Sequence, residues 1–262
     1  MPKPLQPGAA LITGASSGIG RALAFALARP GAVLHLSGRD ESRLNAVCAA
    51  VRVLGADARP RVLDVTDRDA MASWIGGAGP LDLVVANAGI SKGTGSGRAE
   101  SAERIAEIMA TNFSGMVNTA MPALALLRGQ ERGADGLRGR IATVASIAAF
   151  FPSPAAPAYC ASKAAADSWT TATAPVAAHW GIAMTSVCPG FVRTAMTENN
   201  RFFMPGIIDA DRAAQIILRS IAAGRRRVVF PLWMGLLTRG AGLLPPRLAG
   251  TISGRFVPDS VD

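Results

Sequence analysis

Short apolar runs alternate with longer stretches of helical period along most of the chain. Several of the short runs are almost continuously hydrophobic, as expected of parallel strands that are covered on both faces. The predicted strands lie at 9–13, 32–37, 60–65, 81–86, 140–146, 183–189 and 226–230. The predicted helices lie at 18–29, 40–54, 67–76, 101–128, 158–179 and 209–223.

This alternation predicts βαβ units and a single-domain, Rossmann-type α/β fold: a doubly wound parallel sheet of about seven strands with helices on both faces. A chain of 262 residues with 50% hydrophobic and 17% charged residues can bury one large core. We therefore predict one domain over residues 1–262, in which residues 231–262 form a hydrophobic C-terminal extension.

The formal net charge of +9 raises a nucleic-acid alternative. The basic residues are spread along the chain, the only dense run is Arg225 to Arg227, and a single tyrosine is available for base stacking. We therefore expect no nucleic-acid partner, and only a general attraction for anionic ligands.

Three cysteines, Cys48, Cys160 and Cys188, have neither the spacing of a metal site nor that of a disulfide framework. The start of the chain resembles neither a signal peptide nor a membrane span. These features predict a cytoplasmic protein without a metal site.

The first predicted strand runs directly into the sequence TGASSGIG, where Gly14, Gly18 and Gly20 lie at a strand-to-helix turn. Backbone N–H groups at the start of a helix can bind a pyrophosphate, and glycines let the backbone approach it closely. The spacing is G-x-x-x-G-x-G rather than the commoner G-x-G-x-x-G. Because many glycine-rich turns are only tight turns, this motif needs support from elsewhere in the chain.

Four further motifs supply that support: NAG at 87–89, a serine at position 146, Tyr-x-x-x-Lys at 159–163 and PG at 189–190. Together with the glycine turn, these motifs resemble the classical short-chain dehydrogenase/reductase family. They occur in the family's order over about residues 8–223, with the serine thirteen residues before the tyrosine, as in the family.

The resemblance implies a catalytic set of Asn112, Ser146, Tyr159 and Lys163. Tyr159 would be the general acid/base, Ser146 would hydrogen-bond the substrate oxygen, and Asn112 would hold a water in a proton relay. Lys163 lies one helical turn from Tyr159 and would also hold the nicotinamide ribose. Its charge, at an effective dielectric of about 20, would lower the pKa of the phenol by about two units.

The resemblance also implies a nicotinamide dinucleotide cofactor. One departure from the family pattern is Ala86, which stands where relatives often have a first asparagine, and we do not expect it to abolish activity. The expected cofactor contacts are Gly14, Ser16, Ser17, Gly18, Ile19, Gly20, Arg39, Asp64, Val65, Asn87, Ala88, Gly89, Tyr159, Lys163, Pro189, Gly190 and Thr194.

The end of the second predicted strand indicates which cofactor is preferred. It reads Ser37-Gly38-Arg39, with no carboxylate for the ribose hydroxyls of NAD and with a guanidinium for a 2′-phosphate. We therefore predict a preference for NADP(H) and leave NAD(H) open. Asp40 follows directly, and Ser17 stands where some NADP-using relatives carry a base; both weaken the preference.

The loops after Ser146 and Thr194 would form the walls of the substrate pocket. Their apolar residues favour a lipophilic ketone or secondary alcohol, whereas Arg193 and Arg201 leave an anionic group open. An alternative is that the apolar residues only pack on one another. They are Phe150, Phe151, Pro152, Phe202, Phe203 and Met204.

Two features concern assembly. Pro175 removes a backbone hydrogen bond inside the helix that starts near Tyr159 and predicts a kink there. Relatives often associate through this helix, so we predict a homodimer or homotetramer with altered packing.

The extension 231–262 carries apolar residues between Arg239, Arg247 and Arg255. We favour a lid on the pocket or an oligomer contact for it, with a peripheral membrane contact as the alternative.

The resulting prediction is an NADP-dependent oxidoreductase that transfers a hydride between the nicotinamide and a ketone or secondary alcohol. One alternative is a non-catalytic nicotinamide-nucleotide-binding regulatory protein of the same fold, and another is a basic interaction protein. The intact set of Ser146, Tyr159 and Lys163 argues against the regulator, and the scattered charge argues against the interaction protein.

Overall fold

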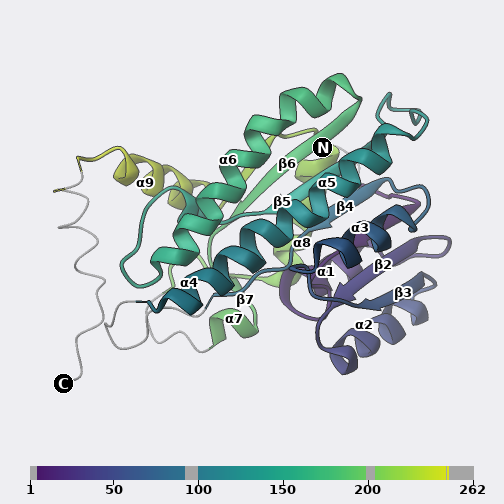
Figure 1. Ribbon diagram of the computed structural model, residues 1–262, viewed down its shortest axis with the longest axis horizontal. Helices are drawn as coiled ribbons and strands as arrows, with labels where there is room; N and C mark the ends of the chain where they lie inside the picture. The colour runs from purple at the N-terminus through teal and green to yellow at the C-terminus, as the bar shows by residue number, and fades with distance from the viewer. Residues whose placement is uncertain (1–4, 92–99, 199–203, 246, 248–262) are drawn as a thin grey trace.

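The computed structural model describes residues 5–91, 100–198, 204–245 and 247. Within this part, seven parallel strands form one sheet in the order β3-β2-β1-β4-β5-β6-β9 (Figure 1). They are β1 Ala9–Ile12, β2 Val33–Gly38, β3 Asp57–Val62, β4 Leu83–Ala86, β5 Gly139–Val144, β6 Ile182–Pro189 and β9 Arg227–Phe230. The strand order reverses between β1 and β4, and ligands bind such sheets at the carboxyl ends of the strands beside that point. The predicted Rossmann-type sheet is confirmed.

Helices cover both faces of the sheet (Figure 1). One layer holds α1 Gly18–Leu27, α2 Glu41–Val53 and α8 Ala210–Ala222. The other layer holds α3 Arg68–Gly76, α5 Gly115–Arg128 and α6 Pro157–His179, with α4 Ala102–Met109 leading into α5.

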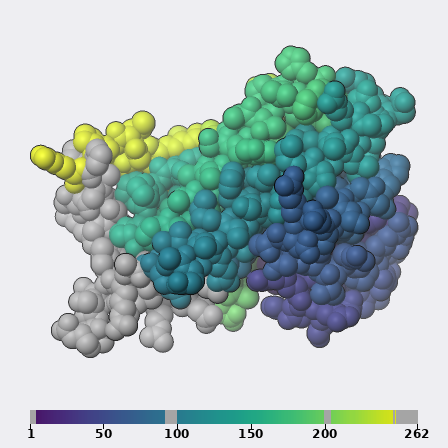
Figure 2. All heavy atoms as spheres, viewed as in Figure 1, coloured from purple at the N-terminus to yellow at the C-terminus, as the bar shows by residue number. Residues whose placement is uncertain are grey.

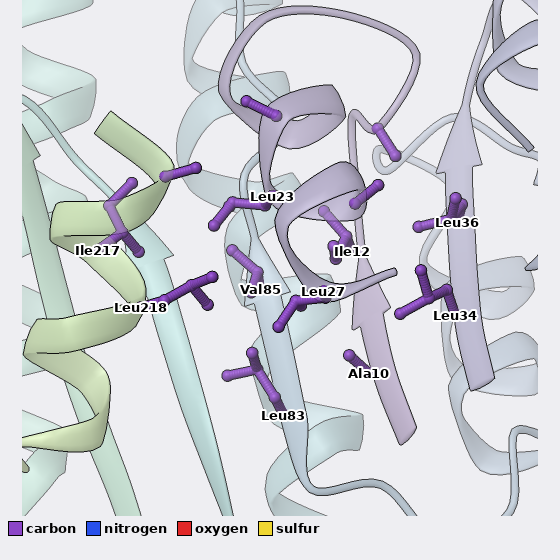
Figure 3. Packing of buried hydrophobic residues seen from close by; sticks show 14 of the residues in the cluster. Ala10, Ile12, Leu23, Leu27, Leu34, Leu36, Leu83, Val85, Ile217 and Leu218 are labelled. Atoms are coloured by element: carbon purple, nitrogen blue, oxygen red, sulfur yellow. The ribbon is translucent and has the colours of Figure 1, made fainter. Parts of the chain in front are cut away.

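The strands are apolar on both sides because each side of the sheet has its own core. Figure 3 shows Leu23 and Leu27 of α1 packed over Ile12 of β1, with Ile217 of α8 in the same cluster further along the sheet. The neighbouring Leu11 points to the opposite layer, as the period of two along a strand requires. Each such leucine or isoleucine is fully or almost fully buried, which contributes about 1.5–3 kcal/mol per side chain.

The third strand lies three residues earlier than predicted, at Asp57–Val62 instead of 60–65. It is an edge strand and most of its side chains are exposed, so it lacks the apolar run that marks the inner strands. Of the apolar residues that suggested the later position, Val62 ends the strand, and Leu63 and Val65 lie in the following loop on either side of Asp64.

Shorter elements lie at the carboxyl ends of the strands. They are the π-helix η1 Ala110–Ser114, the 3₁₀ helix η2 Ile147–Ala149, the strands β7 Val192–Arg193 and β8 Ile208–Asp209, and the helices α7 Ala195–Glu198 and α9 Leu232–Gly242. The helix α9 lies in the predicted extension and was not among the predicted helices. The helix α6 continues past Pro175 to His179, so the proline does not end it.

Candidate active site

The glycine turn between β1 and α1 is built from backbone constraints. Gly14 has φ +64° and Gly18 has φ +52°, a left-handed conformation that side chains disfavour. A Cβ on Gly20 would overlap the carbonyl oxygen of Gly14 and lie 2.6 Å from Asn87 Nδ2. The N-terminus of α1 therefore packs directly against the turn at the carboxyl end of β1.

The NAG motif holds this turn from the neighbouring strand. Asn87 Nδ2 donates to the carbonyl oxygens of Thr13 (2.9 Å) and Gly14 (3.2 Å). In return, Thr13 Oγ1 accepts the N–H groups of Asn87 (3.0 Å) and Ala88 (3.2 Å). Sequence reasoning gave Thr13 no role, although a buried threonine at the end of an apolar strand is a recognisable signal.

The residues Ser146, Tyr159 and Lys163 come together at the carboxyl end of β5. Lys163 Nζ lies 5.7 Å from the centroid of the Tyr159 ring and donates to Val144 O at 2.7 Å. Ser146 Oγ accepts the N–H of Ala148 at 3.1 Å, which fixes the hydroxyl at the start of η2. Ser146 also hydrogen-bonds the Tyr159 phenol.

The electrostatics of this trio differ from the sequence expectation. Burial raises the pKa of Tyr159 above its ordinary value, and the hydrogen bond with Ser146 only partly opposes the increase. Burial also lowers the pKa of Lys163 to about 8. The expected lowering of the Tyr159 pKa by Lys163 is therefore not found in the polypeptide, because desolvation dominates and disfavours the charged form of both groups.

Asn112 lies on η1, where the helix widens between α4 and α5. Its Oδ1 accepts the N–H of Ile90 at 2.7 Å, and its Nδ2 donates to Ile90 O at 2.9 Å and to Ser162 Oγ at 3.0 Å. A Cβ on Gly89 would lie 3.2 Å from Asn112 Oδ1 and 3.3 Å from Lys163 Nζ. The glycine thus leaves room for both the amide and the amine beside the NAG motif. A π-turn at a functional residue is a common arrangement.

Arg39 and Asp64 lie at the carboxyl ends of β2 and β3, where sequence reasoning placed the adenosine end of the cofactor. Arg39 Nη1 lies 3.6 Å from Asp64 Oδ2, and Thr66 donates to Asp64 Oδ1 from its N–H and its hydroxyl, both at 2.9 Å. Burial raises the pKa of Asp64, but the hydrogen bonds from Thr66 and the charge of Arg39 outweigh it and hold the pKa below its usual value. Val65 follows, and a Cβ on Gly115 would overlap its side chain.

Asp40 is occupied by the start of α2. Its Oδ1 accepts the N–H of Arg43 at 2.9 Å as the N-cap, and its Oδ2 accepts Arg43 Nε at 2.7 Å. These hydrogen bonds from Arg43 lower the pKa of Asp40. A cavity of about 230 Å³ adjoins this pair, and its lining includes Ser16 of the glycine turn together with Arg21 and Arg43. Ser17 lies at the N-cap position of α1, and Ile19 packs against the core.

The segment after β6 closes the site from the other side. A Cβ on Gly18 would lie 3.1 Å from Thr194 Cγ2, so Thr194 lies next to the glycine turn. Gly190 donates to Phe230 O at 2.7 Å, and a Cβ on Gly190 would lie 3.2 Å from Met234 Sδ. Ser146 Oγ lies 3.4 Å from Pro189 O. This segment therefore brings the glycine turn, the serine and α9 into one site.

The helix α9 packs against Gly190 and against the loop after Ser146. Met234 and Gly235 are buried, and a Cβ on Gly235 would overlap the Val229 side chain of β9. A Cβ on Gly242 would overlap Phe150 O in the loop after Ser146. Of the predicted pocket residues, Arg201, Phe202 and Phe203 lie outside the described residues.

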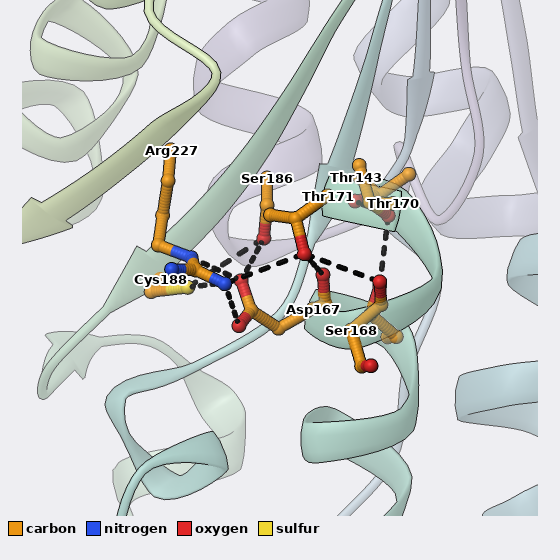
Figure 4. Close-up of polar contacts among 9 residues, drawn as sticks. Thr143, Asp167, Ser168, Thr170, Thr171, Ser186, Cys188 and Arg227 are labelled. Carbon is orange, nitrogen blue, oxygen red and sulfur yellow. Dashed lines mark hydrogen bonds and ion pairs between the residues drawn. The ribbon is translucent and has the colours of Figure 1, made fainter. Parts of the chain in front are cut away.

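A polar network that sequence reasoning missed lies behind the trio. Asp167 is on the same face of α6 as Lys163, one turn further along, and Figure 4 shows Arg227 and Ser186 converging on it. Arg227 Nε and Nη2 donate to the two oxygens of Asp167 at 2.8 and 2.7 Å, and Ser186 Oγ donates at 2.6 Å. Cys188 also contacts this carboxylate, and burial raises the pKa of its thiol to about 12. The network ties α6 to β6 and β9.

The fold and the site together define a Rossmann-type protein with a glycine turn at the carboxyl end of β1 and with a serine, a tyrosine and a lysine at the carboxyl end of β5. A family model described as short chain dehydrogenase matches residues 8–203. The chain belongs to the short-chain dehydrogenase/reductase family, as its sequence motifs suggested. It is an oxidoreductase of this family, consistent with NAD(P)-dependent action on CH–OH and C=O groups.

Two relatives and two solved structures illustrate the similarity. An "Uncharacterized oxidoreductase" from Myxococcus xanthus is 35% identical over 94% of this chain and 96% of the relative. An "11-beta-hydroxysteroid dehydrogenase A" from Arachis hypogaea is 34% identical over 85% of this chain and 68% of the relative. A short-chain dehydrogenase from Sphingobium yanoikuyae, solved with NADPH, is 25% identical over 91% of this chain and 95% of its own, with a TM-score of 0.75. A Burkholderia phymatum member solved with NAD is 22% identical over 97% and 96%, with a TM-score of 0.77.

Proposed function

We propose that the protein transfers a hydride between NADP(H) and a lipophilic ketone or secondary alcohol, with Tyr159 as the general acid/base. The observation that carries this proposal is the meeting of Ser146, Tyr159 and Lys163 at the carboxyl end of β5, beside the glycine turn. The proposed enzyme is a single domain, with residues 231–262 as its C-terminal extension. We also propose that it works in the cytoplasm, which is supported by the three free cysteines among the described residues.

The cofactor fits the cradle described above. A Cβ on Gly14 would lie 2.8 Å from Ala88 Cα, so the space over the turn is kept open by the absence of a side chain. The N–H groups at the start of α1 would hold the pyrophosphate. Lys163 and Asn87 would lie along the nicotinamide half, and Asp64 with Val65 along the adenine. When bound, the nicotinamide supplies or accepts the hydride.

The side chains of the chain itself then handle the oxygen and the proton. Ser146 Oγ holds the substrate oxygen, and during reduction Tyr159 Oη donates its proton to that oxygen as the carbonyl carbon accepts the hydride. In oxidation the same oxygen returns the proton to Tyr159. The pKa of Tyr159 is raised by burial, so the phenol carries at neutral pH the proton that reduction of a carbonyl requires, as an ordinary tyrosine also would. Asn112, with Lys163 beside it, lies where a relay to solvent would start.

The preference for NADP(H) is supported by the charges at the end of β2. Arg39 is exposed beside Asp64, and Asp40 is already bound by Arg43, so Asp40 offers little to the ribose hydroxyls of NAD. A guanidinium can bind a 2′-phosphate through two hydrogen bonds. The relative solved with NADPH is consistent with this preference, although the member solved with NAD shows that the fold accepts both.

The Arg39→Ala variant tests the preference. We expect the Kd of NADPH to rise by about tenfold to a hundredfold, because a charge-assisted bidentate contact to phosphate is lost. The Kd of NADH should change by less than about twofold, and isothermal titration calorimetry measures both. Equal changes for the two cofactors, or tighter binding of NADH by the wild-type protein, would refute the preference.

A lipophilic substrate is supported by what surrounds Ser146. Ile147 and Met234 both approach Gly190, and Phe150 follows in the same loop. Arg193 is exposed and donates to Asp209 at 2.9 Å, so its charge is already paired, which weakens the anionic alternative. The Arachis hypogaea relative is named as a hydroxysteroid dehydrogenase, which is consistent with an apolar pocket.

We also propose that the protein assembles as a homodimer or homotetramer. The exposed apolar side chains of Met121 on α5 and Val176 on α6 support a contact through this helical layer. Multi-angle light scattering at micromolar concentration measures the assembly, and a monomer would refute it.

The Tyr159→Phe variant tests the chemistry. The substitution removes only the hydroxyl, so we expect kcat to fall by about a hundredfold to ten-thousandfold with the Kd of NADPH changed little. A panel of ketones and alcohols, followed at the nicotinamide absorbance, measures the turnover. If the wild-type protein binds NADPH without turnover of any member of a wide panel, the non-catalytic regulator is the better explanation.

A further inference from the structure

The helix α9 has an unusual outward face. A surface helix normally packs an apolar side on the protein and turns a polar side to water. On the packed side of α9, Met234 and Gly235 are buried, and Thr238 and Ala241 are half-buried beside them. The exposed side carries the large apolar residues. They are Leu232 (67% exposed), Trp233 (47%), Leu236 (63%) and Leu237 (64%), with Leu243 (87%) directly after the helix.

These side chains form one continuous stripe. At 100° per residue, positions 232, 233, 236, 237 and 243 fall within about 140° of one another, and among residues 232–243 the only other position in that sector is Gly240. No charged residue interrupts the stripe; Arg239 lies at its edge, exposed, with its guanidinium 4.3 Å from the centroid of the Phe150 ring. Figure 2 shows α9 at the outer end of the molecule. Contiguous exposed apolar patches of this kind mark interaction sites.

The charge of the surrounding sequence indicates what the stripe contacts. Residues 231–258, which comprise α9 and the chain on either side of it, contain three arginines and no aspartate or glutamate. A symmetric contact between two copies would place this basic segment of one copy against that of the other. An anionic surface is complementary to it, and an apolar stripe flanked by arginines fits a lipid interface better than the phosphates of a nucleic acid.

We propose that the outward stripe of α9 docks the protein on the surface of a bilayer that contains anionic lipids. The helix lies in the interface and does not span it, because eleven residues are too few and no described helix meets the requirements of a membrane span. The leucines and Trp233 enter the boundary between headgroups and acyl chains, and Arg239 remains at headgroup level.

Docking in this way has a consequence for the site. Met234 on the packed side of α9 adjoins Gly190, so the element that contacts lipid also forms a wall of the site. A lipophilic substrate dissolved in the bilayer would then be released next to Ser146. This last step rests on the proposed function, whereas the docking does not.

Vesicle co-sedimentation of the full chain tests the docking. The probes are vesicles of phosphatidylcholine alone and of phosphatidylcholine with one part in three of phosphatidylglycerol. The variant is Leu236→Gln with Leu237→Gln, and the matched control is Val53→Gln with Leu54→Gln, two exposed apolar residues at the end of α2. We expect the wild-type protein and the control to bind the anionic vesicles. The α9 variant should bind them with an affinity lower by about tenfold or more. Binding to neutral vesicles should be weaker, and salt should reduce the binding to anionic ones.

Failure of wild type to bind anionic vesicles, or equal binding by the α9 variant, overturns the proposal. A shift of the α9 variant to a smaller oligomer in light scattering, without vesicle binding by wild type, would assign the stripe to contacts between copies instead. Turnover of a water-soluble ketone with NADPH separates this result from the proposed function, because the α9 variant should retain it. If the wild-type protein turns over the ketone but does not bind vesicles, only the docking proposal fails. If it binds vesicles but has no turnover, only the proposed enzymatic function fails.

Discussion

The two sides of the candidate active site are built by different means. On the cofactor side, backbone meets backbone: Gly20 contacts the carbonyl of Gly14, and Asn87 hydrogen-bonds the same turn. On the substrate side, side chains from distant segments pack together, as Met234 does against Gly190. Backbone contacts leave no room for larger side chains, so few sequences can form the cofactor side. Packed side chains can be exchanged for others of similar volume, so many sequences can form the substrate side. We therefore expect the cofactor side to be intolerant of substitution, whereas the substrate side should accept substitutions at a moderate loss of stability.

The Gly20→Ala variant tests the rigid side and should have the largest effect. Its Cβ would overlap the Gly14 carbonyl oxygen, which cannot move without the turn, so we expect a loss of about 3 kcal/mol or more in the free energy of unfolding. NADPH binding should weaken by about a hundredfold or more. Urea denaturation and calorimetry measure the two effects. The control is Gly76→Ala, because a Cβ at the end of α3 meets nothing within 4 Å. Equal stability of the two variants would contradict the comparison.

Lys163 lies on the border between the two sides, and its titration should give an intermediate effect. Its pKa is about 8 in the folded chain against 10.5 for an ordinary lysine, so between these values the unfolded chain holds a proton that the folded chain has lost. Stability therefore rises with pH across this window, by about 1 kcal/mol per pH unit relative to Lys163→Met, which does not titrate. Urea denaturation of both proteins at pH 7, 8, 9 and 10 measures the difference. Parallel curves would mean that the amine is not desolvated.

The Gly235→Ala variant tests the adaptable side and should have the smallest effect. Its Cβ would overlap Cγ1 of Val229, and α9, which packs through side chains here, would have to shift by a fraction of an ångström. We expect a loss of about 1 kcal/mol in stability and a rise of about threefold in the KM of the ketone, with the Kd of NADPH unchanged. The control is Gly240→Ala on the outward side of α9, where a Cβ meets nothing within 4 Å. An altered NADPH affinity in Gly235→Ala would show that the two sides are coupled.

The same contrast explains what could be predicted from the sequence. The sheet and the glycine turn were predictable because buried parallel strands are apolar throughout and because tight turns need glycine at particular spacings. The edge strand β3 was misplaced because its side chains are mostly exposed. The trio was found through the family resemblance, since only the spacing of Tyr159 and Lys163 is visible from local periodicity.

Long-range pairing was the part that could not be predicted. Asp167 and Arg227 are sixty positions apart, and nothing local marks them as partners. The raised pKa of Tyr159 also depends on how deeply the fold buries the phenol, whereas its distance from Lys163 follows from helical spacing alone. The capping of α2 by Asp40 and its pairing with Arg43 were likewise not among the predictions.

The π-helix at Ala110–Ser114 determines how this chain tolerates insertions and deletions. Its wider turn lets Asn112 reach both polar atoms of Ile90 while α4 and α5 continue as one rod. Because a π-turn holds one extra residue in a widened turn, removing a single residue here would restore regular α-helical winding and leave the packed faces of α4 and α5 close to their present orientation. The widened turn itself would be lost, and with it the hydrogen bonds between the Asn112 amide and Ile90. Substitutions can accumulate along α4 and α5, but the number of residues between them cannot change without the loss of these hydrogen bonds.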